Sequence, residues 1–160
     1  MDSTFTAEDH HRRGLAALSE DRREIALDHF RAAQKLDPSS ATYRSFYGLA
    51  IGLAERRLDR ALALCRDAAQ TEFFNPVHYH NLARLHLAFG FKPEAIRFLR
   101  RGLMIDPGNA AIAFEMQGLG VRRRPPLGFL RRRNLLNRLG GRLLRRLRSE
   151  PEPSLSLVGS

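Results

Sequence analysis

The 160-residue sequence contains a single cysteine, no tryptophan and two lysines against 25 arginines. One cysteine excludes a disulfide bond within the chain. No stretch is apolar over the length of about 18 residues that a membrane-spanning helix needs. The N-terminal segment, MDSTFTAEDHHRRG, contains no apolar run. We therefore expect neither a transmembrane helix nor a signal peptide, and we predict a cytoplasmic protein. The arginine bias is typical of a GC-rich genome and has no physical consequence by itself.

The chain also lacks the residue patterns of catalytic and metal sites. His78 and His80 are two residues apart, and His10 and His11 are adjacent. On a helix such pairs point in different directions, which makes them poor metal ligands. No phosphate-binding loop, nucleophile elbow or pair of catalytic acids stands out. We therefore expect no enzymatic activity, no cofactor and no metal.

What the chain does contain is a repeat, seen best at residues 75–109, NPVHYHNLARLHLAFGFKPEAIRFLRRGLMIDPGN. This stretch predicts two helices of similar length, because proline follows each start and glycine ends the first. A set of small and apolar residues ending in proline occurs twice, with the same intervals of 4, 3 and 5 residues. A third set between them has the same intervals of 4 and 3 residues, and the chain before it is one residue longer than in the other two units. The three sets are Ala26, Phe30, Ala33 and Pro38; Ala61, Cys65 and Ala68; and Ala95, Leu99, Gly102 and Pro107.

Small residues at these positions let antiparallel helices approach closely, and no unit buries its apolar face alone. We interpret Cys65 as a small buried hydrophobe equivalent to Phe30 and Leu99, with a reactive thiol as the alternative. The alternative is an ordinary helical bundle in which the similarity is accidental, but the same spacing recurs three times, which favours a repeat.

Over residues 7 to about 109 the sequence resembles the tetratricopeptide (TPR) family, whose repeat is about 34 residues long. The middle unit departs from the pattern, because Pro76 comes eight residues after Ala68 instead of five, and no unit has a tryptophan. The resemblance implies a bacterial TPR protein with an all-α fold, a right-handed superhelical solenoid. The matching residues are Gly14, Ala26, Phe30, Ala33, Pro38, Tyr47, Gly48, Ala61, Ala68, Tyr79, Leu82, Ala83, Ala95 and Pro107.

The predicted organisation is an N-terminal extension (1–6), a TPR domain (7–120), a basic tail (121–148) and a disordered C-terminus (149–160). Within the domain we expect units at about 7–40, 41–75 and 76–109, followed by a capping helix at 110–120. The expected helices span 6–19, 22–35, 40–54, 57–70, 76–89, 92–105 and 109–117, and Thr6 is the expected N-cap of the first.

Charge is divided unevenly along the chain. Residues 121–148 hold 11 arginines and no acid, whereas residues 1–120 hold 16 basic and 15 acidic side chains. We predict an amphipathic helix from Asn134 through Leu147, weakened by Gly140 and Gly141, which cost about 2 kcal/mol relative to alanine. The predicted basic site consists of Arg122, Arg123, Arg124, Arg131, Arg132, Arg133, Arg138, Arg142, Arg145 and Arg146.

Three interpretations of this tail remain open. Its leucines can dock on the last repeat helices, which is a structural role. A basic amphipathic helix also suits an anionic membrane surface, which would make the protein a peripheral membrane protein. Arginine clusters contact nucleic-acid phosphates as well, although Phe129 is the only aromatic residue of the tail that could stack on a base.

In TPR proteins the first helix of each pair lines a concave surface that binds peptides. The resemblance therefore implies a non-enzymatic scaffold or adaptor with a protein or peptide partner. The TPR class that clamps acidic C-terminal peptides of chaperones requires lysine and asparagine where this chain has His11 and Leu15, so we reject that ligand. A TPR chaperone of bacterial secretion is an alternative. The predicted groove residues are His11, Leu15, Ser45, Leu49, His80, Arg84 and Leu87, with Leu18 and Leu53 beside them.

Overall fold

The computed structural model describes residues 5–120, and this part of the chain is entirely helical. The arginine-rich tail, its predicted helix and the predicted disordered C-terminus lie outside the described residues. The predicted all-α solenoid is confirmed, and each expected helix of the described range is present. Three pairs and a last single helix follow one another: α1 (Ala7–Ser19) and α2 (Arg23–Leu36); α3 (Ala41–Ala50), which continues as the π-helix η1 (Ile51–Glu55), and α4 (Leu58–Thr71); α5 (Pro76–Ala88) and α6 (Lys92–Ile105); and α7 (Ala110–Gly118).

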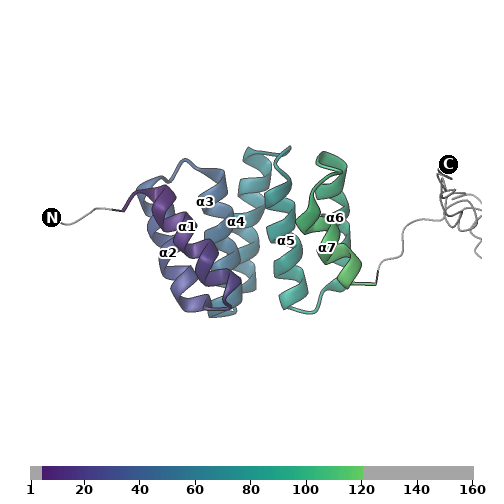
Figure 1. The fold of residues 1–160 in the computed structure, drawn as a ribbon, viewed down its shortest axis with the longest axis horizontal. Coiled ribbons are helices and arrows are strands. Elements are labelled where there is room, and N and C mark those ends of the chain that lie inside the picture. Colours follow the sequence, from purple (N-terminus) through teal and green to yellow (C-terminus); the bar gives the residue numbers. More distant parts are fainter. Residues whose placement is uncertain (1–4, 121–160) are drawn as a thin grey trace, which may run out of the picture. The chain divides into compact units, whose positions relative to one another are not determined.

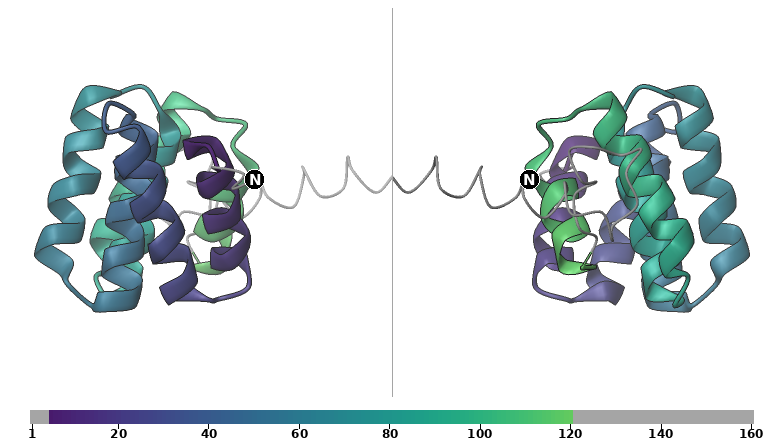
Figure 2. Two further views of the ribbon diagram at one scale, coloured as in Figure 1. Left: turned by 90° about the vertical axis from the view of Figure 1, so that its left-hand side faces the viewer. Right: turned by 90° about the vertical axis from the view of Figure 1, so that its right-hand side faces the viewer.

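The helix pairs stack side by side from α1 and α2 at one end to α6 and α7 at the other (Figure 1). Seen from the ends of the stack, α1 and α7 lie on one side of the body and α4 lies on the opposite side (Figure 2). The core between the two layers contains Phe30, Leu49, Ile51, Leu82 and Leu85, all fully buried. Stacking therefore buries the apolar faces that no single pair could cover.

The first helices are capped by side chains, whereas the second helices are not. Thr6 caps α1 in a capping box with Asp9, as predicted, while Ser40, Asn75 and Asn109 cap α3, α5 and α7. Each of these side-chain oxygens accepts a hydrogen bond from a backbone N–H that has no partner within its helix. The second helices instead follow tight turns, which hold α2, α4 and α6 close to their partners.

The extra residue of the middle unit lies where the helix changes its hydrogen-bonding pattern. At Ile51 the α-helix α3 continues as the π-helix η1, whose wider turn contains one additional residue. The next residue, Arg56, has φ +58°, and it matches Asp21 (φ +55°) and Gly90 (φ +83°) in the other two turns. A π-helix thus absorbs the insertion before the turn, so the second helix of the unit keeps its position.

The structure corrects the alignment of the middle unit. Pro76 is not the equivalent of Pro38 and Pro107; it opens α5. Phe73 takes the place of that proline, five positions after Ala68, as Pro38 follows Ala33. α4 therefore ends normally at Thr71, and its length equals that of α2 and α6, at 14 residues each.

Candidate functional site

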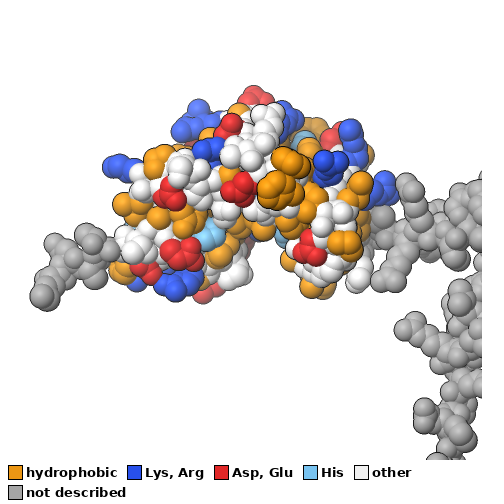
Figure 3. Space-filling model, turned by 90° about the horizontal axis from the view of Figure 1, so that it is seen from above, with side chains coloured by type: hydrophobic (Ala, Val, Ile, Leu, Met, Phe, Trp, Pro, Cys, Tyr) orange, Lys and Arg blue, Asp and Glu red, His pale blue; other side chains and the backbone are white. Residues whose placement is uncertain are grey.

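The body is hollowed along one edge, between the end that carries α1 and the end that carries α7 (Figure 3). The first helices of the pairs face this hollow, as the resemblance implies. We name it the concave face. Equivalent positions of consecutive repeats face the same way, so the alignment of the units identifies the side chains that lie on the concave face.

Consecutive first helices meet through one repeated contact. The His11 ring lies 4.8 Å from the Phe46 ring, Asn81 Nδ2 donates to Ser45 Oγ at 3.0 Å, and His80 Nε2 donates to Glu115 Oε2 at 2.5 Å. Each pair occupies the same two positions of its units. Along the stack the contact changes from a pair of aromatic rings to an amide–hydroxyl hydrogen bond and then to a histidine–carboxylate hydrogen bond.

This contact explains why part of the predicted groove is inaccessible. Ser45 and Leu49 are fully buried, and His11 is enclosed by the rings of Phe30, Tyr43 and Phe46. Phe46 covers His11, Asn81 covers Ser45, and Leu49 lies in the core, so none of the three is accessible to a partner in this structure. Their role in binding stays a prediction. Burial lowers the pKa of His11, and the nearby Glu8 carboxylate only partly offsets that effect.

The remaining predicted groove residues are at least partly accessible. Leu15 is exposed on α1, while Leu18 and Leu53 are half-buried against the main core. Leu87 is half-buried against a second cluster that contains Leu99 and the α7 residue Ile112. Of these four leucines, Leu15 at the α1 end of the concave face is therefore the exposed one.

His80 and Arg84 form the polar part of this surface, together with Glu115. The His80 and Glu115 side chains are 21% and 25% exposed. Arg84 is half-buried, so desolvation lowers the pKa of its guanidinium, while the Glu115 carboxylate acts in the opposite direction. The Glu115 carboxylate of the protein itself thus lies near both the His80 ring and the Arg84 guanidinium.

Sequence reasoning missed two residues of this site. Phe114 is 79% exposed on α7 and lies one repeat after His80, in the same register. Glu115 is likewise one repeat after Asn81, which in turn is one repeat after Phe46. The repeat register would have identified both residues, had it been extended into the capping helix.

The other candidate residues have separate surroundings. His78 Nε2 lies 3.0 Å from Glu72 Oε2, and His10 Nδ1 lies 3.1 Å from His29 Nδ1. Among residues 5–120, no three histidine, cysteine or acidic side chains are grouped to hold a metal ion. None of the helices in that range combines the length and apolar character needed to cross a membrane. Cys65 is fully buried, as expected, and its thiol donates to the Ser45 carbonyl oxygen at 3.2 Å.

Comparison with solved structures shows the fold of TPR domains. The first TPR domain of Spaghetti (RPAP3), solved bound to the HSP90 peptide SRMEEVD, superimposes with a TM-score of 0.54 at 16% identity, over 72% of this chain and 90% of that one. The Arabidopsis OM64 TPR domain gives a TM-score of 0.54 at 22% identity, over 71% and 93%. No family model matches the sequence, and no curated protein does. Nothing in these similarities supports a bacterial origin, which stays a prediction.

Proposed function

We propose that this protein is a non-enzymatic interaction module whose concave face binds an extended peptide or protein segment. The observation that carries this proposal is the hollow between α1 and α7, which is lined by accessible apolar and polar side chains of the first helices (Figure 3). One structural neighbour, the RPAP3 domain, was solved with a peptide bound. TPR domains typically act as interaction modules and not as enzymes.

The residues of the concave face indicate the kind of segment that fits. Leu15 and Phe114 supply apolar contacts near the two ends, and His80, Arg84 and Glu115 supply hydrogen-bonding groups. A ligand carboxylate would have to compete with Glu115, which already accepts a hydrogen bond from His80. We therefore propose a peptide with apolar anchors and backbone hydrogen bonds, without the acidic C-terminus that the chaperone-binding TPR class requires.

This proposal is tested by selecting peptides from a random heptapeptide display library against the full chain and measuring their affinities for surface variants. We expect Phe114→Asp combined with Leu15→Asp to weaken the selected peptides at least tenfold, since apolar anchors of interfaces typically contribute about 2 kcal/mol or more. Met104→Asp is the matched control, because Met104 is 74% exposed on the second helix α6.

Peptides that bind the double variant as tightly as the parent chain would contradict the proposal. So would a loss caused by Met104→Asp alone. The tail-based alternatives, tethering to an anionic membrane or to nucleic acid, concern residues 121–148 and stay predictions, as does the secretion-chaperone alternative. Deleting residues 121–148 should leave peptide binding to the concave face unchanged.

A further inference from the structure

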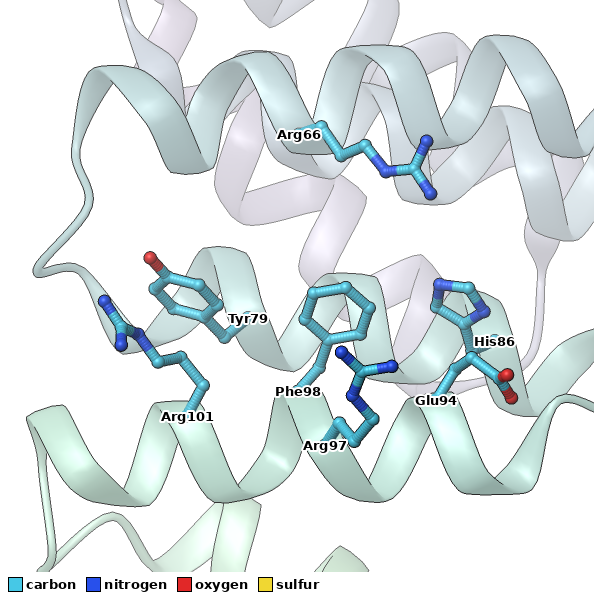
Figure 4. A pocket seen from close by; sticks show the side chains of 7 residues that line it. All are labelled: Arg66, Tyr79, His86, Glu94, Arg97, Phe98 and Arg101. Carbon is cyan, nitrogen blue, oxygen red and sulfur yellow. The ribbon is translucent and has the colours of Figure 1, made fainter.

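A second cavity lies away from the concave face, between the second helices α4 and α6 with α5 as its floor (Figure 4). Its volume is about 400 Å³, near the lower end of the range for small-ligand sites. We name it the α4–α6 pocket. Its lining residues are Arg66 from α4, Tyr79 and His86 from α5, and Glu94, Arg97, Phe98 and Arg101 from α6.

The rim of the α4–α6 pocket carries an excess of positive charge. Arg66, Arg97 and Arg101 contribute three guanidinium groups, whereas Glu94 is the only acidic side chain of the lining. Arg66 and Arg97 come from opposite sides of the gap, with Phe98 and His86 between them in the view of Figure 4. Within residues 5–120, none of the three arginines forms an ion pair with a carboxylate.

Aromatic side chains of α5 and α6 together form the floor of the pocket. The Phe98 ring stacks on the His86 ring, with centroids 5.2 Å apart and planes inclined by 19°. Tyr79 donates its hydroxyl hydrogen to the Phe73 carbonyl oxygen at 2.9 Å, which fixes its ring, and the Arg101 guanidinium lies 5.8 Å from that ring. A flat apolar group can therefore lie on this floor while the rim contacts charge.

His86 is the second, independent feature that indicates a ligand. The residue is only 7% exposed, and neither ring nitrogen has a hydrogen-bond partner among the described residues. A buried polar atom without a partner loses its hydrogen bonds to water and gains none, so such groups are rare in folded proteins. Burial lowers the pKa of this imidazole, with Glu94 opposing the effect and Arg66 adding to it.

We propose that the α4–α6 pocket binds a small oxyanion, a carboxylate or a phosphate, carried on a flat apolar body. The oxyanion contacts the guanidinium groups of Arg66 and Arg97 and comes within reach of the His86 ring. The apolar body lies on Phe98 and Tyr79. Guanidinium groups favour such ligands because their N–H donors match the geometry of two oxygens. This site is separate from the concave face, so it does not depend on the proposed function.

The test is a nuclear magnetic resonance titration of the full, ¹⁵N-labelled chain with phenyl phosphate, benzoate and benzyl alcohol. We expect shifts of the backbone signals around His86 and Phe98 with one or both anions, a Kd of about 1 mM or tighter, and much weaker binding of the neutral alcohol. Phenyl phosphate and benzoate distinguish a phosphate from a carboxylate ligand. The His86 ring signals should also report a raised pKa in the complex, because a bound anion favours the charged imidazole.

Three surface variants make the test specific. Arg66→Gln and Arg97→Gln should together weaken anion binding about tenfold or more, because each removes charge-assisted hydrogen bonds to the oxyanion. Arg100→Gln removes the same charge from the same helix outside the pocket lining and should change the Kd less than about twofold. The proposal is overturned if neither anion shifts the pocket signals, if benzyl alcohol binds equally well, if the shifts are confined to residues 121–148, or if Arg100→Gln has the same effect as the pocket variants.

Discussion

Two helix backbones of a pair approach closely at Gly48, where α3 meets α4. A β-carbon added there would lie 2.9 Å from Cys65 Sγ, 2.9 Å from Leu64 Cβ and 3.0 Å from the Ala61 carbonyl oxygen. The last contact is to backbone, so no side-chain rotation relieves it. The substitution Gly48→Ala must therefore push α3 and α4 apart.

The expected size of this effect is the difference between two opposing contributions. Overpacking a buried contact costs about 1–3 kcal/mol, and alanine favours a helix over glycine by about 1 kcal/mol. We expect Gly48→Ala to lower the free energy of unfolding by about 1–2 kcal/mol, because the backbone contact places the cost in the upper part of its range. For a body of this size that corresponds to a fall in Tm of roughly 4 °C per kcal/mol.

Gly118→Ala is the control, because a β-carbon at Gly118 meets nothing within 4 Å and the residue ends helix α7. It should leave stability unchanged or raise it by up to about 1 kcal/mol. Urea unfolding followed by far-ultraviolet circular dichroism measures both variants and the parent chain. If Gly48→Ala is as stable as Gly118→Ala, then close backbone packing does not explain glycine at this position.

Two further predictions concern a turn and the buried thiol. Gly90 has φ +83° with open space around its Cα, so Gly90→Ala should cost about 1–2 kcal/mol from backbone strain alone, measured by the same urea unfolding; an unchanged midpoint would contradict this. Burial raises the pKa of Cys65 to about 12, so between its unfolded pKa near 9 and about 12 the unfolded chain binds fewer protons than the folded one. Stability should therefore fall with rising pH in this window, by about 1.4 kcal/mol per pH unit from this group. Cys65→Ala should flatten that dependence, and equal slopes for both chains would refute the assignment.

The fold could be predicted because the information that determines it is local and periodic. Small residues recur at one position of each first helix and at one position of each second helix, and both positions lie where paired helices are in close contact. These residues are Gly14, Gly48 and Ala83 in the first helices and Ala26, Ala61 and Ala95 in the second helices. The sequence shows that the middle unit has one extra residue, but it does not show that this residue is accommodated in a π-helix. Whether a chain absorbs such a residue in a turn or as a π-helix depends on what the next unit packs against it. The mistaken equivalence of Pro76 arose because proline serves both at the end of a unit and at the start of a helix.

The site was less predictable, because accessibility depends on contacts between units. The repeat register predicts which face of α3 carries Ser45 and Leu49, but it does not predict how closely α5 approaches α3 and buries both side chains. The buried hydrogen bond between Asn81 and Ser45 joins two different units, and neither residue belongs to the repeat signature. Exposure at a given register position therefore differs from unit to unit even when the backbone repeats.

For the ligand that we propose for the concave face, the repeated contact between first helices limits which junctions it can enter. At the first two junctions, the residue of the later helix is Phe46 or Asn81, and it seals His11 or Ser45 inside. At the last junction the later residue is Glu115, and both it and His80 remain partly exposed. Among the three junctions between described first helices, this is the one whose two polar partners are both accessible to water. A ligand that replaced Glu115 at His80 would exchange one accessible hydrogen bond for another, whereas entry at Ser45 would require breaking a buried one without compensation. Recognition on the concave face should therefore be concentrated at α5 and α7, with Leu15 serving as the distant apolar anchor.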